Sequence, residues 1–135
     1  MQSKVGRIIA LDYGSKRIGI AVSDETKTIS QPKPYILNAE KEKLITFIKE
    51  NEIEEILLGL PIALSGKETQ STIKVQDFER WLKEKTNLPI KMIDERLTTQ
   101  EIRRTETDKE LIDSLVAQKM LERYLDSYIR KIRNS

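Results

Sequence analysis

Two short apolar runs joined by a glycine-containing turn, within residues 8–24, constrain the fold of this chain more than any other stretch. Residues 4–12 are typical of a central strand, residues 13–16 of a tight turn, and residues 17–23 of a second strand. One face of the second strand carries only small residues, Gly19, Ala21 and Ser23, which indicates that another element packs closely against it. The first run ends in Asp12, where a core strand normally carries an aliphatic residue, and a buried carboxylate is costly unless something pairs with it.

Composition narrows the chemistry that such a site could perform. A chain of 135 residues predicts one domain, residues 1–135, and no apolar run reaches the roughly 20 residues of a membrane helix. The absence of a secretory signal and of cysteine favours a cytoplasmic location. With no Cys and no His there is no thiol nucleophile, imidazole base or Cys/His zinc site, which leaves carboxylates, hydroxyls, Lys, Arg or a hard metal ion. A net charge of +2 means that only local basic clusters could attract nucleic acid.

The rest of the chain alternates strand and helix patterns. Prolines within residues 26–37 predict an irregular edge strand, and the apolar run in residues 54–60 is typical of a parallel strand covered on both faces. Residues 90–93 form a further short strand pattern. Amphipathic helices are expected over residues 40–51, from about residue 69, and over residues 109–133, with a short capped helix beginning at Thr98. The helix from residue 69 is expected to bury Ile73, Val75, Phe78, Trp81 and Leu82.

Three acidic residues occupy positions where the pattern calls for apolar or structural residues. Asp12 and Glu95 each follow a strand, and Asp113 falls on the buried side of the last helix. Each also has a structural interpretation: Asp12 as a turn residue, Glu95 as a surface partner of Arg96 or Arg17, and Asp113 as a charge that favours the helix dipole. Because sites in open α/β sheets form at the carboxyl ends of strands, their convergence favours a functional cluster.

Clustered carboxylates repel one another unless a cation neutralises them. Mg²⁺ or Mn²⁺ would suit oxygen ligands, and two such ions roughly 4 Å apart could promote phosphodiester cleavage. The nearby basic residues Lys16, Arg17, Lys67 and Arg96 are candidates for phosphate binding, as are Arg103 and Arg104, although single basic residues are more often solvated surface. Tyr13, in the turn, could stack on a base.

Four motifs make the chain resemble, nearly end to end, the YqgF family, also called the RuvX, pre-16S rRNA nuclease or Holliday-junction-resolvase-like family. The first runs Leu-Asp-Tyr-Gly-Ser-Lys-Arg-Ile-Gly-Ile-Ala-Val-Ser-Asp from Leu11 to Asp24. The second is Gly59-Leu60-Pro61 followed by Ser65-Gly66, and the third is Asp94-Glu95-Arg96-Leu97-Thr98-Thr99. The fourth is Asp113-Ser114-Leu115-Val116-Ala117. Asp12, Glu95 and Asp113 match the three acidic positions of the family.

The resemblance implies a ribonuclease-H-like fold of class α/β, with a mixed five-stranded sheet flanked by helices. It implies divalent-metal-dependent cleavage of structured nucleic acid, with maturation of the 5′ end of 16S rRNA as the favoured role and resolution of four-way DNA junctions as the alternative. The chain departs from the family pattern at Ala63, at Ser65 and at Thr69-Gln70-Ser71, which replaces a common Gly-Pro-Arg and predicts that a phosphate-contacting Arg is missing from that loop.

Two functions from other classes stay open at this stage. The Asp-x-Gly hairpin also resembles the first phosphate motif of actin-like sugar kinases and ATPases, but 135 residues leave no room for their second lobe. A non-catalytic RNA-binding module would need none of the three acids. The expected partner is therefore nucleic acid, with precursor rRNA favoured over branched DNA, no membrane partner, and a monomer or weak homodimer as the assembly.

Overall fold

Five strands form one mixed sheet in the structure, a computed structural model that describes residues 6–60, 70–94, 102 and 109–133. The strand order is β3-β2-β1-β4-β5, with β1 antiparallel to β2 and parallel to β4, β2 antiparallel to β3, and β4 parallel to β5. The five-stranded mixed sheet expected from the family resemblance is confirmed. The strands are β1 (Arg7–Tyr13), β2 (Arg17–Ser23), β3 (Ser30–Leu37), β4 (Ile53–Leu60) and β5 (Ile90–Asp94).

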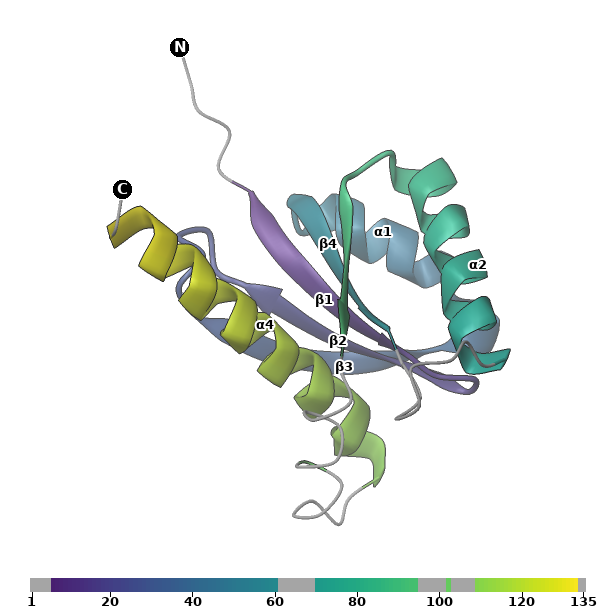
Figure 1. The fold of residues 1–135 in the computed structure, drawn as a ribbon. Coiled ribbons are helices and arrows are strands. Elements are labelled where there is room, and N and C mark those ends of the chain that lie inside the picture. Colours follow the sequence, from purple (N-terminus) through teal and green to yellow (C-terminus); the bar gives the residue numbers. More distant parts are fainter. Residues whose placement is uncertain (1–5, 61–69, 95–101, 103–108, 134–135) are drawn as a thin grey trace.

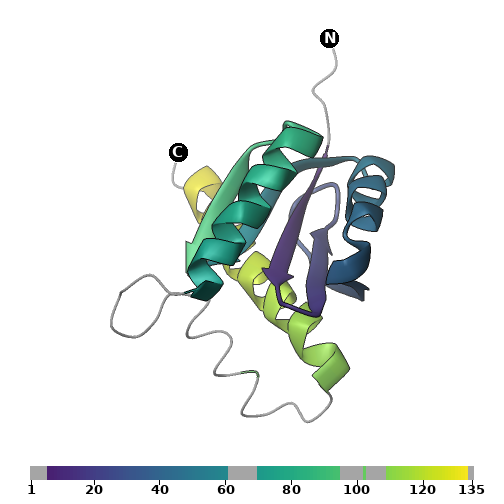
Figure 2. The same cartoon turned by 90° about the vertical axis from the view of Figure 1, so that its right-hand side faces the viewer.

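Helices cover both faces of this sheet. The long helix α4 (Lys109–Arg133) crosses one face, while α1 (Glu42–Glu50) and α2 (Gln70–Thr86) pack on the other, as Figures 1 and 2 show from two directions. A single 3₁₀ turn, η1 (Asn38–Glu40), leads from β3 into α1. Among the residues that the structure describes, no helix is both long and apolar enough to cross a membrane.

Alternation along the central strands divides the core into two clusters. Ile9, Leu11, Ile18 and Ile20 face α1 and α2, together with Val75, Phe78 and Leu82. Ile8, Ala10 and Ala21 face α4 and pack against its apolar stripe of Ala117, Met120, Leu121 and Leu125. Because side chains alternate along a strand, Asp12 lies on the α4 face with Ile8 and Ala10.

Local patterns predicted most element boundaries well. The second strand and the last helix begin and end where the sequence placed them, and β3 is an edge strand as its prolines predicted. The prediction that Ile73 is buried was wrong, since this residue is 50% exposed. It lies 200° around the helix from Val75, and the buried Thr72 takes the inward position instead. The predicted helix at Thr98 and the loop positions Ala63, Ser65 and Thr69 lie outside the described residues.

Candidate active site

Asp12 is the buried carboxylate of the site. It is the penultimate residue of β1, the central strand of the sheet, and is only 7% exposed. The parallel strands β4 and β5 end at the same edge as β1, at Leu60 and Asp94, and the N-terminal end of α4 also lies there (Figure 1). A carboxylate thus lies at the strand ends where open α/β sheets form their sites.

Gly19 brings a second carboxylate next to the first. It is the registered partner of Asp12 across the β1–β2 ladder, and α4 rests directly on it. A Cβ atom at Gly19 would lie 2.1 Å from the carbonyl oxygen of Asp113 and 2.8 Å from its Cβ. Only a glycine leaves room for this approach of α4. The prediction that another element packs closely on the face of β2 with small side chains is confirmed. Asp12 and Asp113, 101 positions apart in sequence, lie on the two sides of one glycine.

Arg17 forms an ion pair with Asp113, the member of this acidic pair on α4. Its Nε lies 3.1 Å from Oδ2 of Asp113, in an ion pair whose aspartate side chain is 16% exposed. Its guanidinium also lies over the ring of Tyr35, 5.6 Å from the ring centroid. A planar guanidinium can lie flat over an aromatic ring while its N–H groups face a carboxylate. Arg17 thereby links the carboxylate on α4 to an aromatic side chain on the edge strand.

Two polar side chains hold the elements of the site in place. The buried hydroxyl of Ser114 accepts a hydrogen bond from the backbone N–H of Ile20 (3.3 Å) and donates one to the carbonyl of Lys33 (2.7 Å), which ties α4 to β2 and β3. Asn38 donates its side-chain N–H to the carbonyl of Gly14, and its backbone N–H to that of Lys16, both at 2.8 Å. These contacts secure the hairpin turn.

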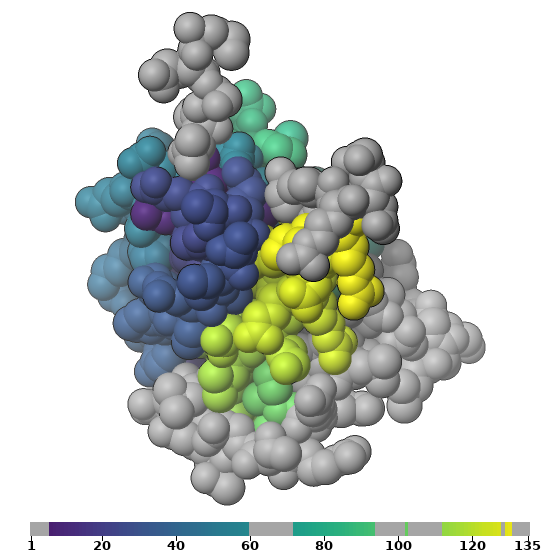
Figure 3. Space-filling view, turned by 90° about the vertical axis from the view of Figure 1, so that its left-hand side faces the viewer, coloured from purple at the N-terminus to yellow at the C-terminus, as the bar shows by residue number. Residues whose placement is uncertain are grey.

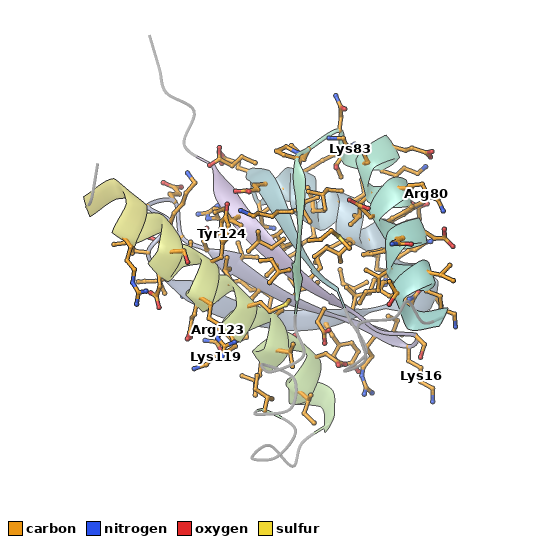
Figure 4. All side chains as sticks on the ribbon, in the orientation of Figure 1. Lys16, Arg80, Lys83, Lys119, Arg123 and Tyr124 are labelled. Carbon is orange, nitrogen blue, oxygen red and sulfur yellow. The ribbon has the colours of Figure 1, made fainter. Side chains whose placement is uncertain are left out.

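Of the remaining predicted site residues, the structure describes only Lys16. Lys16 is exposed at the tip of the β1–β2 hairpin and points away from the sheet (Figure 4). Glu95, Lys67 and Arg96 lie outside the described residues, so their predicted roles stay predictions. Within the described part of the chain, no three acidic, His or Cys side chains are grouped closely enough to hold a metal ion.

Asp24, which closes the first motif, is a structural residue. Its carboxylate accepts backbone hydrogen bonds from Thr28 and Ile29, both at 2.8 Å, and a bond from the hydroxyl of Thr26. Slight burial raises the pKa of Asp24, but the hydrogen bonds from Thr26, Ile29 and Thr28 outweigh it and hold the pKa well below its usual range. Asp24 therefore holds the turn that follows β2.

Three side chains near the site, Tyr35, Ser114 and Asn38, were not among the predicted site residues, and base stacking by Tyr13 stays a prediction. The Tyr13 ring lies 4.4 Å from that of Phe78, on the α2 face, so it is turned away from Asp12. The tyrosine on the site's side is Tyr35, which no local pattern marks as functional. Ser114 was readable as a hydroxyl on the buried face of a helix, but Asn38 had no comparable signal.

Comparison with solved structures defines the class of fold. Thermus thermophilus RuvC bound to a Holliday junction substrate superposes with a TM-score of 0.57 at 10% identity, over 92% of this chain and 96% of that chain. A second structure of Thermus thermophilus RuvC superposes with a TM-score of 0.56 at 9% identity, over 91% of this chain and 96% of that chain. The sheet order, the helices on both faces and this likeness place the protein in the ribonuclease-H-like fold class.

Sequence relatives define the family. The family RuvX, described as Holliday junction resolvase, matches residues 6–127, and the chain belongs to it. A "Putative pre-16S rRNA nuclease" of Koribacter versatilis is 38% identical over 90% of this chain and 87% of its own length. Relatives with the same description in Dictyoglomus turgidum and a Sulfurihydrogenibium species are 36% and 39% identical, each over 90% of this chain. The predicted family is confirmed.

Proposed function

We propose that this protein is a divalent-metal-dependent nuclease that cleaves phosphodiester bonds in structured nucleic acid, with precursor 16S rRNA as its substrate. The observation that carries the proposal is the pairing of Asp12, nearly buried at the end of the central strand, with Asp113 across Gly19. Gly19 lets the backbone of α4 approach β2 closely enough to place a second aspartate beside the first. Family membership and the description shared by its relatives support the substrate.

The chemistry of the residues fits a hard divalent cation. Asp12 and Asp113 offer anionic oxygen ligands, which Mg²⁺ and Mn²⁺ prefer, and the chain has no Cys or His to select a softer metal. Glu95, which follows the last residue of β5 in sequence, is the proposed third ligand. A divalent cation bound there would stabilise charge on the phosphate and lower the pKa of the attacking water.

The described residues supply the other requirements of the reaction. Asp12 and Asp113 fix the ligand geometry because one is held in a strand and the other in a helix docked on the same strand pair. Arg17 neutralises part of the negative charge at Asp113 and orients its carboxylate. Lys16, at the exposed hairpin tip, is available to a phosphate of the substrate backbone (Figure 4).

The decisive variant is Asp12→Asn, which keeps the size of the side chain and removes its charge. Wild type and variant are incubated with precursor 16S rRNA, single-stranded RNA and a four-way DNA junction, with Mg²⁺ or with Mn²⁺. We expect Asp12→Asn to cut at least about 100-fold more slowly. Asp77→Asn, at an exposed carboxylate of α2 paired with Arg80, is the matched control and should cut at the wild-type rate.

The substrate that only wild type cuts decides between the remaining functions. Full activity in Asp12→Asn, with the variant folded by circular dichroism, would refute the nuclease assignment to this site. Cleavage of the junction alone would favour a Holliday junction resolvase, an alternative motivated by the likeness to RuvC bound to a junction. Binding of RNA with no cleavage under any metal would favour the non-catalytic RNA-binding module.

A further inference from the structure

A groove opens beside the candidate active site, between the edge strand β3 and the N-terminal half of α4. It encloses about 600 Å³ and is mostly apolar, with Leu37 at its rim 44% exposed. Figure 3 shows the face on which the yellow-green surface of α4 lies against the dark blue segment that includes β3. The groove is lined by Pro32, Lys33, Pro34, Tyr35, Leu37, Ser114 and Leu115.

An irregularity in β3 turns Tyr35 toward the site. Ile18 of β2 pairs with Ile36, and Ile20 pairs with Lys33, so two residues of β3, Pro34 and Tyr35, lie opposite Gly19 alone. A bulge of this kind redirects side chains and is frequent next to active sites. Gly19 is also the residue that pairs with Asp12 and supports Asp113. Tyr35 therefore lies in the same row of the sheet as the buried carboxylate, two strand spacings or roughly 10 Å away.

Contacts at the groove connect it to the acidic pair. Ser114, next in sequence to Asp113, lines the groove and holds the backbone of Lys33 through a 2.7 Å hydrogen bond. Arg17 is shared, because it pairs with Asp113 and lies over Tyr35. A molecule in the groove would thus contact Tyr35 and Ser114, and it would lie near the Arg17 guanidinium that is placed over Tyr35 and pairs with Asp113.

We propose that this groove is a base-binding subsite, in which a nucleobase next to the cleaved phosphate stacks on Tyr35. The inference rests on the proposed nuclease function and specifies its substrate class: a single-stranded segment of RNA or DNA at the cut. An apolar groove with an aromatic ring accepts any base face, and the Arg17 guanidinium over Tyr35 has the charge that a neighbouring phosphate requires. Bases within a duplex are stacked on one another and do not offer their faces, so a duplex does not fill the groove.

The test measures binding without cleavage. A short fluorescein-labelled single-stranded RNA, and the same RNA annealed to its complement, are titrated by fluorescence anisotropy in the presence of EDTA and at fixed salt. Tyr35→Ala removes the ring, Tyr35→Phe keeps it, and Tyr35→Leu keeps an apolar side chain without an aromatic face. Ile29→Ala is the control for an exposed apolar side chain outside the groove, since Ile29 is 58% exposed.

Loss of stacking predicts a pattern across these variants. Tyr35→Ala and Tyr35→Leu should bind the single strand at least about 5-fold more weakly, whereas Tyr35→Phe and Ile29→Ala should stay within about 2-fold of wild type. Duplex binding should not change in any of them. Wild-type affinity in folded Tyr35→Ala or Tyr35→Leu overturns the proposal, and so does an equal loss for duplex and single strand.

Other outcomes identify other occupants. If wild type sediments as a dimer and Tyr35→Ala as a monomer, the groove is an interface between copies of the chain, and the base-binding proposal is wrong. Failure of the nuclease proposal would be seen separately. In that case Asp12→Asn would still cleave the substrate, while the RNA binding measured by anisotropy would not change. Failure of the groove proposal leaves that cleavage assay unchanged and appears only in the titrations.

Discussion

Replacing Gly19 by alanine should separate α4 from the sheet at the site. A Cβ at this position would lie 2.1 Å from the carbonyl oxygen of Asp113, whereas real Cβ atoms essentially never come within 3.0 Å of such a neighbour. The helix backbone must therefore move by at least the difference, 0.9 Å. The obstructing atom belongs to backbone inside a long helix, so no side-chain rotation can relieve the contact.

The energetic cost follows from the contacts that this shift disturbs. Overpacking in a core costs about 1–3 kcal/mol, and weakening of the two Ser114 hydrogen bonds adds about 1 kcal/mol for each. The better intrinsic strand preference of alanine returns about 0.5–1 kcal/mol. We expect a net loss of about 2–4.5 kcal/mol in the free energy of unfolding, or a fall in Tm of roughly 6–18 °C for a domain of this size.

Two measurements test this expectation. Thermal unfolding by circular dichroism reports the stability loss, and the cleavage assay reports the displacement of Asp113, for which a shift near 1 Å predicts a loss of about 100-fold. Gly6→Ala is the matched control, because its Cβ would meet the side chain of Glu54, 2.8 Å away, far from the site. It should lose some stability and keep its cleavage rate per folded molecule. A Gly19→Ala variant with wild-type Tm would refute the close approach of α4.

Three further variants probe other features of the structure. Ser114→Ala leaves the N–H of Ile20 and the carbonyl of Lys33 without this partner and should cost about 1–3 kcal/mol in urea unfolding. Asp24→Ala should cost about 1–2 kcal/mol at pH 7. Since the folded-state pKa of Asp24 is depressed, this contribution is present above about pH 4 and is lost as pH falls toward the folded-state pKa, so unfolding curves of wild type and variant should converge in acid. Lys16→Gln should reduce the slope of log affinity against log salt for RNA by about one, measured by anisotropy.

Each of these results has a contrary outcome. Unchanged urea unfolding of Ser114→Ala would mean that its hydroxyl does not tie α4 to the strands. A stability difference for Asp24→Ala that persists unchanged below the folded-state pKa would show that charge is not its source. A wild-type salt slope in Lys16→Gln would place the hairpin tip outside the nucleic-acid contact.

Strand and helix boundaries could be predicted because they follow from local patterns. Residues 17–23 alternate in size and residues 109–133 keep one apolar stripe, so both elements were delimited without knowledge of their neighbours. The position of Asp113 on the buried side of its helix was readable in the same way. Helix geometry could also have corrected the prediction for Ile73, since this residue lies 200° from the buried Val75.

Contacts between segments that are far apart in the sequence could not be predicted from the sequence alone. The carboxylates were expected to repel one another until a metal bound, yet Arg17, 96 positions away, already pairs with Asp113. Arg17 had been considered as a partner of Glu95 or of phosphate, and no local signal selects Asp113 in its place. Tyr35 is turned toward the site by a bulge in the pairing of β3 with β2, and register at an edge strand is not encoded in a short pattern.

The way α4 packs on the sheet affects how the candidate active site can lose its activity. Among the described residues the contacts of α4 are mainly with β1, β2 and β3, while α1 and α2 lie on the opposite face of the sheet (Figure 1). Helices held mainly by one face of a sheet can open as separate cooperative units below the global unfolding free energy. Such an opening would remove Asp113 while Asp12 stayed in its strand, so the protein could become inactive well before its sheet unfolded. Amide hydrogen exchange that protects α4 less than β1 would reveal this opening.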